Sequence, residues 1–270
     1  MLASLDSLAM KFNSTFTKLS AIAVSGAILS SAAIAEAVSI NRTTGFWTGV
    51  TGGEEIVYGN NDGSSTTFGP STVQGTTGEN QARWGTPFQG SASDHDSKSG
   101  LGFEGVGATD VDFGEVFQLG TLTHYNNPIH LGGAASAASL DLELDLGDLG
   151  VKSFDFNFDI EETPNSESLE NCAYDSDVPC ADRISWTSAF SSESFTVEGQ
   201  KYTVELLGFS ETAGSSLIQE FISQENRSSA VNLFARLTIA PPSTGVPEPA
   251  ALLGIGFVGS YLVARRRRRG

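Results

Sequence analysis

Basic residues are scarce in this sequence. Its 270 residues include 15 lysines and arginines against 32 aspartates and glutamates, a formal net charge of −17. Seven of the basic residues lie in the first 35 residues or in the arginine run Arg265 to Arg269. The segment between holds 8 basic and 31 acidic side chains, a net charge near −23. Such a surface repels phosphate groups, which excludes nucleic acid and anionic lipid as the main partner.

The sequence also lacks the short motifs that carry common enzyme chemistry. It has no phosphate-binding glycine loop, no nucleophile elbow, no zincin motif and no internal repeat. We therefore expect no enzymatic activity. A hydrolase with paired carboxylates stays open as an alternative, because so many acidic residues make close pairs easy to form. It would need two acids about 5–9.5 Å apart in a cleft.

The first 37 residues resemble a secretory signal. Lys11 and Lys18 form a basic region, residues 19–34 are mostly apolar, and Ala33-Ile34-Ala35 is a small-x-small cleavage site. Residues 35–37 repeat that small-x-small pattern. This signal implies the Sec translocon and signal peptidase as transient partners.

The basic region also bears on where translation begins. Asp6 is unfavourable in a basic region, whereas Met10-Lys11 opens a better signal. We therefore expect translation to begin at Met10.

The last 30 residues form a second distinct segment. Residues 241–249 are a linker that contains Pro247-Glu248-Pro249, and prolines stop both helices and strands. Residues 250–264 carry no charge and predict a helix about 22 Å long, short of the roughly 30 Å hydrocarbon core. Arginines of the tail 265–270 can extend to the headgroups and stay cytoplasmic. The alternative, a basic tail that binds nucleic acid, fits the acidic remainder poorly.

This end of the chain resembles the PEP-CTERM sorting signal. The resemblance rests on Pro247, Glu248 and Pro249, the apolar segment 250–264 and the five arginines Arg265, Arg266, Arg267, Arg268 and Arg269. It implies that an exosortase recognises the chain and removes the tail near the Pro-Glu-Pro motif. The chain would be anchored transiently in the inner membrane and then reside at the cell surface or outside the cell. The implied setting is a bacterium that makes exopolysaccharide, which is then a candidate partner.

Cysteine is almost absent, with only Cys172 and Cys180. A metal-binding pair is disfavoured because no Cys-x-x-Cys spacing or histidine cluster accompanies them. An even count in an exported chain favours a disulfide, here closing a short loop.

The clearest periodicity lies between residues 140 and 160. Apolar residues alternate with mostly acidic ones on both sides of the loop 147–151, which predicts an antiparallel pair of half-buried strands. The eight predicted core residues are Leu140, Leu142, Leu144, Leu146, Phe154, Phe156, Phe158 and Ile160.

Other segments predict further strands and no long helix. Residues 194–197 and 201–209 predict a hairpin, 183–187 and 230–239 predict strands, and 215–223 is open between strand and short helix. With 30 glycines and many serines and threonines, this indicates an all-β domain over 38–240. We expect an antiparallel β-sandwich of jelly-roll type between an N-terminal signal helix and a C-terminal transmembrane helix.

Two groups of acidic residues are candidates for calcium. In an extended loop Asp94 and Asp96 could share a cation while His95 faces away. The second group, on the polar face of the first alternating strand, is Asp141, Glu143 and Asp145. The alternative for both is a solvated surface, and we expect no other cofactor.

Residues 122–128 end a predicted strand, since Pro128 restricts the residue before it. Within it, His124 could be a ligand or a base, and we expect a hydrogen-bonded structural role. Thr123-His124-Tyr125-Asn126 resembles the Thr-His-x-Asn signature of the THxN group of PEP-CTERM proteins, which are similar to choice-of-anchor K extracellular domains. The similarity extends loosely through residues 162–165 to about 240, and implies placement and fold, not a reaction.

Together these features predict an exported surface or matrix protein with a structural or adhesive role. The alternative is a carbohydrate-binding module, with or without calcium, that uses exposed Trp47, Trp84 or Trp186 as sugar platforms. Burial of these tryptophans would count against it.

Overall fold

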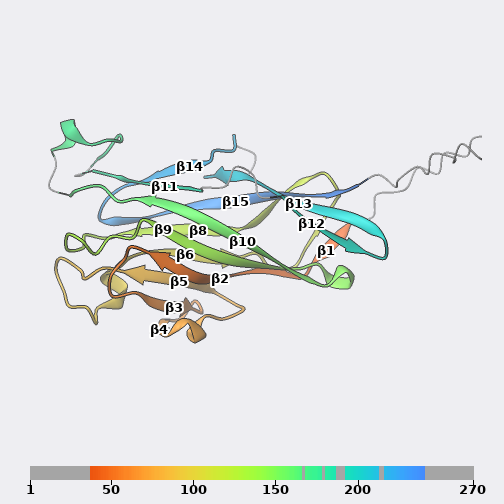
Figure 1. The fold of residues 1–270 in the computed structure, drawn as a ribbon, viewed down its shortest axis with the longest axis horizontal. Coiled ribbons are helices and arrows are strands. Elements are labelled where there is room, and N and C mark those ends of the chain that lie inside the picture. The colour runs from red at the N-terminus through yellow and green to blue at the C-terminus, as the bar shows by residue number, and fades with distance from the viewer. Residues whose placement is uncertain (1–36, 166–167, 178–179, 187–191, 213–215, 241–270) are drawn as a thin grey trace, which may run out of the picture. The chain divides into compact units, whose positions relative to one another are not determined.

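A computed structural model describes residues 37–165, 168–177, 180–186, 192–212 and 216–240 (Figure 1). The predicted signal up to residue 36, the linker, the apolar segment and the arginine tail lie outside this part. Among the described residues no helix is long and apolar enough to cross a bilayer.

The described part is built of antiparallel strands. The larger sheet has eight strands in the order β12 (Ser192–Val197), β13 (Gln200–Ser210), β15 (Arg227–Ile239), β8 (Val116–Asn126), β6 (Ser99–Gly105), β5 (Glu79–Trp84), β3 (Val57–Asn61) and β4 (Thr66–Gly69). The second has five, in the order β14 (Glu220–Ser223), β11 (Asp182–Trp186), β10 (Val151–Glu161), β9 (Ala137–Asp145) and β2 (Arg42–Thr51). A small sheet pairs β1 (Val38–Ile40) with β7 (Thr109–Val111).

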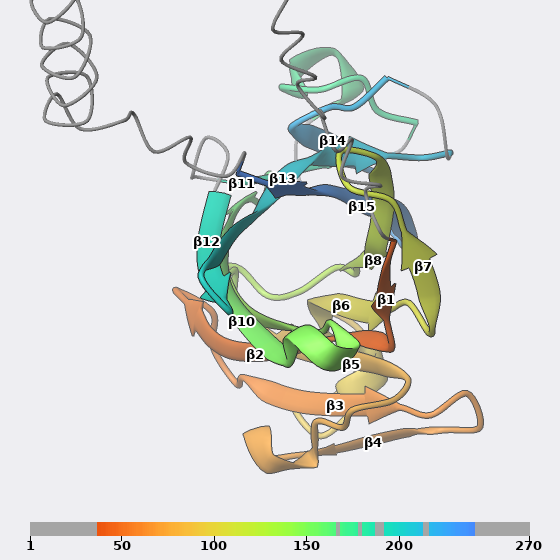
Figure 2. The same ribbon diagram turned by 90° about the vertical axis from the view of Figure 1, so that its right-hand side faces the viewer.

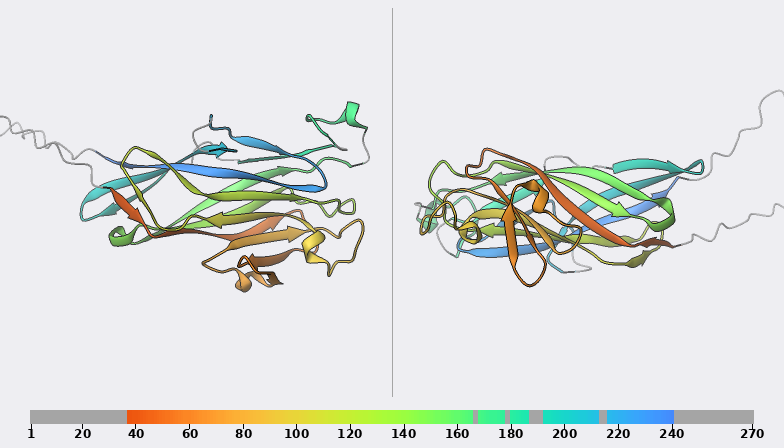
Figure 3. Two further views of the ribbon diagram at one scale, coloured as in Figure 1. Left: turned by 180° about the vertical axis from the view of Figure 1, so that it is seen from behind. Right: turned by 90° about the horizontal axis from the view of Figure 1, so that it is seen from below.

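Helical structure in the described part is limited to four short 3-10 turns, visible from several sides in Figure 3. They are η1 (Ser71–Val73), η2 (His95–Ser97), η3 (Gly147–Leu149) and η4 (Leu169–Asn171). The expected all-β class is therefore confirmed for the described residues.

The alternating segment forms the centre of the five-stranded sheet. β9 and β10 pair antiparallel through η3, with Leu142 opposite Phe154. All eight predicted core residues are buried, none exposing more than 5% of its surface. The period-two pattern thus predicted this pair correctly, because burying one face of each strand removes only apolar side chains from water.

The two large sheets share one apolar core, consistent with a β-sandwich. Figure 2 shows the strands of both sheets surrounding a common interior. The buried apolar side chains of the two sheets form one core cluster there. Phe209 of β13 lies 6.3 Å from Phe158 of β10 and 4.4 Å from Trp186 of β11, measured between ring centroids. These contacts join the eight-stranded sheet to the five-stranded one.

Other predicted local features are also present. β12 and β13 form the predicted hairpin, turning at Glu198 and Gly199, both with positive φ. The ambiguous segment contains a strand, β14, at its end. Cys172 and Cys180 form the predicted disulfide.

Candidate functional site

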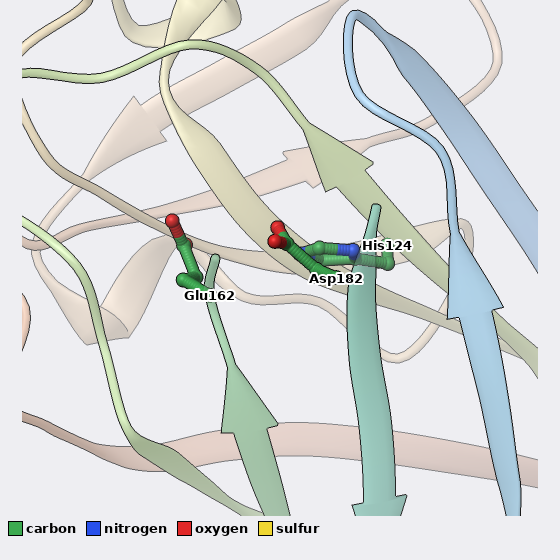
Figure 4. A group of neighbouring side chains, drawn as sticks. All are labelled: His124, Glu162 and Asp182. Atoms are coloured by element: carbon green, nitrogen blue, oxygen red, sulfur yellow. The ribbon is translucent and has the colours of Figure 1, made fainter. Parts of the chain in front are cut away.

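His124 lies in β8 and points into the space between the sheets (Figure 4). Its side chain is fully buried, and neither ring nitrogen has a hydrogen-bond partner among the described residues. The expectation of a hydrogen-bonded structural histidine is therefore wrong. A buried imidazole without partners forfeits its hydrogen bonds to water, so this position requires another explanation.

Two carboxylates approach His124 from the opposite sheet. Glu162 follows the last residue of β10, and Asp182 is the first residue of β11. The register of these strands pairs Glu161 with Arg183, so Glu162 and Asp182 are the next opposed pair. One ligand atom each from His124, Glu162 and Asp182 lies within 4.8 Å of the other two. We call these three residues the His124 cluster.

Hydrogen bonds hold each carboxylate by one oxygen. Asp182 Oδ1 accepts from the Thr163 backbone N–H at 2.8 Å and from its hydroxyl at 3.2 Å. Glu162 Oε1 accepts from Trp84 Nε1 at 2.7 Å and from the Ser99 hydroxyl at 3.1 Å. Asp182 Oδ2 is buried and has no partner among the described residues. The neighbours thus orient both acids without neutralising them.

A third acid stands beside the cluster. Glu225, two residues after β14, is 2% exposed, and its Oε1 lacks a partner among the described residues. The strand next to it is fixed by Asn126, whose side-chain amide donates to the Ser223 carbonyl at 2.9 Å. Since His124 and Asn126 are two residues apart in β8, both face inward. The histidine and asparagine of the signature therefore serve the same interior site.

Burial and mutual repulsion determine the protonation of these groups. Burial, followed by the charges of Glu162 and Glu225, raises the pKa of Asp182 to about 8. Burial and then Glu162 raise the pKa of Glu225 to about 7, and burial also raises the pKa of Glu162. Burial and then Arg83 lower the pKa of His124 to about 3, so the imidazole is neutral. The cluster thus combines a neutral imidazole with acidic groups that no positive charge balances. All of these groups can donate an electron pair to a metal ion.

The buried cations of the described part do not supply that charge. Arg83 donates from Nη1 to the Lys98 carbonyl at 2.9 Å and from Nε to Gln81 Oε1 at 3.0 Å. Lys98 donates from Nζ to the carbonyls of Gly85 and Glu55, at 2.7 Å and 3.0 Å. No ion pair joins Glu162 or Asp182 to an arginine or lysine within the described ranges.

The donor set of the His124 cluster fits a divalent transition metal. Zinc is bound tetrahedrally by imidazole nitrogen and carboxylate oxygen at about 2.0–2.2 Å, so two such ligands lie roughly 3.5 Å apart. The ligand atoms of the cluster lie within 4.8 Å of one another, so they would close by up to about 1 Å around a bound ion. Calcium fits less well, since it takes six to eight oxygen ligands and no nitrogen.

The calcium candidates of the sequence lie elsewhere. Asp94 and Asp96 are exposed at the 3-10 turn η2, so the expected alternation of an extended loop is wrong there. His95 lies against the Phe68 ring, 5.3 Å between centroids. Across the described residues, three metal-ligating side chains converge only in the His124 cluster.

The second set, Asp141, Glu143 and Asp145, lies along the outer face of β9, each half-buried. Asp141 stands directly opposite Asp155 of β10. Burial and then the charges of Asp155 and Glu143 raise the pKa of Asp141 above its ordinary value of 3.8. The carboxylates on this face of β9 and β10 therefore repel one another, which destabilises the folded state.

Replacing Asp141 is therefore expected to stabilise the fold. A carboxyl with a raised pKa in the folded state contributes stability below pH 3.8 that is lost as the pH rises through the folded value. At pH 7, Asp141→Asn should raise the free energy of unfolding by roughly 0.3–1 kcal/mol, and the gain should vanish near pH 3. Denaturant titration of both proteins measures it. Stabilisation of the unsubstituted protein alone by calcium would show instead that Asp141 is a ligand.

All three tryptophans lie in the core. Trp47, Trp84 and Trp186 expose 1%, 0% and 8% of their surface. Trp47 and Trp84 donate from their ring N–H groups to the Asn80 carbonyl and to Glu162. None of them offers the flat exposed ring that a sugar platform needs, which counts against the carbohydrate-binding alternative.

The other two residues of the segment 123–126 lie on the opposite face of β8, where Tyr125 contacts Glu79 and Arg83. Thr123 and Tyr125 face away from the interior, and the Tyr125 hydroxyl donates to Glu79 Oε2. The Arg83 guanidinium lies 3.4 Å from the centroid of the Tyr125 ring. The four signature residues therefore divide between the two faces of β8.

Sequence reasoning singled out His124 but missed Asp182 and Glu225. Glu162 was noted only within a loose similarity. One signal was available, because Glu162 continues the inward positions of Phe158 and Ile160. A carboxylate in the core-facing phase of an alternating strand needs a partner.

The comparisons with known proteins assign no family. No protein-family model matches the chain, and no curated protein matches it in sequence. Its function is therefore argued from its own residues.

Proposed function

We propose that this chain is an exported surface or extracellular-matrix protein with a structural or adhesive role in the envelope or exopolysaccharide. The observation that carries the proposal is a succession of three features in the C-terminal sequence: Pro247-Glu248-Pro249, the uncharged segment 250–264 and five arginines. Like a PEP-CTERM signal, it would hold the chain in the inner membrane until an exosortase cuts it. The chain is thus a substrate of processing and not itself an enzyme.

Two features of the domain support export. Cys172 and Cys180 form a disulfide, a bond that persists in oxidising compartments and is rare in the cytosol. The strongly acidic composition suits a soluble domain outside the membrane. We further propose that the two sheets are connected as a jelly roll. Residues 1–37 would form a helical signal, and residues 250–264 a membrane-spanning helix.

Fractionation of a tagged chain tests this function. The intact chain, tagged inside the domain, is expected first in the inner membrane and then, shortened, at the surface or in the medium. Deleting residues 250–270 should release the domain from the membrane without processing. Replacing Pro247, Glu248 and Pro249 by alanine should leave it anchored and uncut, which separates recognition from anchoring. Identical fractionation of all three proteins, or retention in the cytosol, would contradict the proposal.

A further inference from the structure

We propose that His124, Glu162 and Asp182 bind one divalent transition-metal ion, and that this ion cross-links the two sheets of the β domain. The proposal goes beyond the exported role, because it concerns what holds the domain together wherever the domain resides.

Three independent observations converge on this cluster. The imidazole of His124 is completely buried and has no partner for either nitrogen among the described residues. The ligand atoms of Glu162 and Asp182 lie within 4.8 Å of it and of each other (Figure 4). The buried cations, Arg83 and Lys98, donate to other acceptors. A divalent ion supplies the positive charge and the acceptor of electron pairs that this arrangement lacks.

The ligands come from both sheets. His124 belongs to β8 of the eight-stranded sheet, whereas Asp182 belongs to β11 of the five-stranded sheet and Glu162 directly follows β10 of that same sheet. An ion held by all three would fix the distance between the sheets at this end of the core. Burial of His124 and Asp182, 0% and 1% exposed, leaves no room at these side chains for a substrate. The role is accordingly structural.

The chemistry selects the class of ion. A histidine binds a metal as the neutral imidazole, so the two carboxylates balance the charge of one divalent cation. Glu225 stands alongside and could accept a hydrogen bond from a metal-bound water. One nitrogen with two or three oxygens suits zinc, manganese or ferrous iron, whereas calcium would require several more oxygen ligands.

Hydrogen bonds from neighbouring residues already hold the two carboxylate ligands in place. Thr163 fixes Asp182 through two hydrogen bonds to Oδ1, which leaves Oδ2 for the ion. Trp84 and Ser99 fix Glu162 in the same way. Such outer hydrogen bonds orient ligands in metal sites generally.

Calorimetric titration with zinc tests the proposal. The full-length chain, without a polyhistidine tag, is purified in mild detergent, stripped with a chelator and checked for residual metal by mass spectrometry. We expect one zinc per chain. Because loss of an outer-shell partner alone lowers metal affinity by about 10–100-fold, His124→Gln and Asp182→Asn, which remove a ligand, should each lower it by at least about 100-fold. His130→Gln, at an exposed histidine, should not change it.

Circular dichroism establishes that each variant is folded, and Asp182→Asn, which keeps the shape of the side chain, serves if His124→Gln does not fold. Loss of zinc binding in the cluster variants with retention in His130→Gln supports the site. Absence of zinc binding, equal binding by all variants, or stoichiometric calcium binding without zinc binding would overturn it. Because binding is measured on purified protein, these outcomes do not depend on where the cell sends the chain.

Discussion

Adding zinc to the metal-free chain is expected to raise its free energy of unfolding by about 4 kcal/mol once free zinc reaches a thousandfold excess over the dissociation constant. The gain arises because the unfolded chain has no preformed His124 cluster, so the binding energy goes to the folded state. Denaturant titration with and without zinc, in the same detergent, measures it.

The control for this experiment is His124→Gln, which keeps the carboxylates but removes the nitrogen ligand. It should gain no more than about 1.4 kcal/mol from the same zinc concentration, since a 100-fold weaker site is only tenfold in excess. His130→Gln should behave like the unsubstituted protein. Equal stabilisation of all three would show that zinc acts elsewhere, for example at the exposed acidic strands.

The second large effect concerns Asp182→Asn, whose effect on the free energy of unfolding should change sign when zinc is added. In the metal-free chain, Asp182→Asn is expected to raise stability at pH 7, because the Asp182 carboxyl must take up a proton on folding, a cost that the asparagine amide does not have. With zinc present, the same substitution should lower stability, because a ligand is lost. The amide oxygen can still accept from Thr163, so the change removes charge and ligation with little change in shape.

The sign follows from the raised pKa of Asp182, about 8 against an ordinary value of 3.8. Such a group contributes stability that is complete below pH 3.8 and is lost as the pH rises through 8. Burial is the main cause, and the groups that face Asp182 are Glu162, Glu225 and neutral His124.

Between pH 5 and 7 the metal-free protein should therefore lose on the order of 1 kcal/mol per pH unit relative to Asp182→Asn. Asp148→Asn, at an exposed turn position, is the matched control for loss of one carboxyl group. A flat difference across this range would mean that the pKa of Asp182 is not raised in the folded protein.

The sequence allowed the local parts of the fold to be predicted. The alternation of residues 140–160 sets which side chains of β9 and β10 are buried, since the period of a strand is two. The turn at Glu198-Gly199 likewise follows from neighbouring residues. What could not be predicted was the order of strands, which places β8 across from β10 and β11.

The candidate site depends on that order. His124, Glu162 and Asp182 are separated by tens of residues, and nothing in their local patterns joins them. The acidic residues that attracted attention, Asp94, Asp96 and Asp141, lie at exposed or half-buried positions. The informative carboxylates were the few placed in core-facing positions, such as Glu162 after Phe158 and Ile160.

X-ray absorption spectroscopy of the zinc-loaded, full-length chain tests the central claim most directly, because it reports the ligands of the bound ion. The His124 cluster predicts one imidazole nitrogen and two or three oxygens at about 2.0–2.2 Å, with the imidazole signal lost in His124→Gln. A shell of oxygens alone, unchanged by that substitution, would contradict the claim that a metal joins the two sheets.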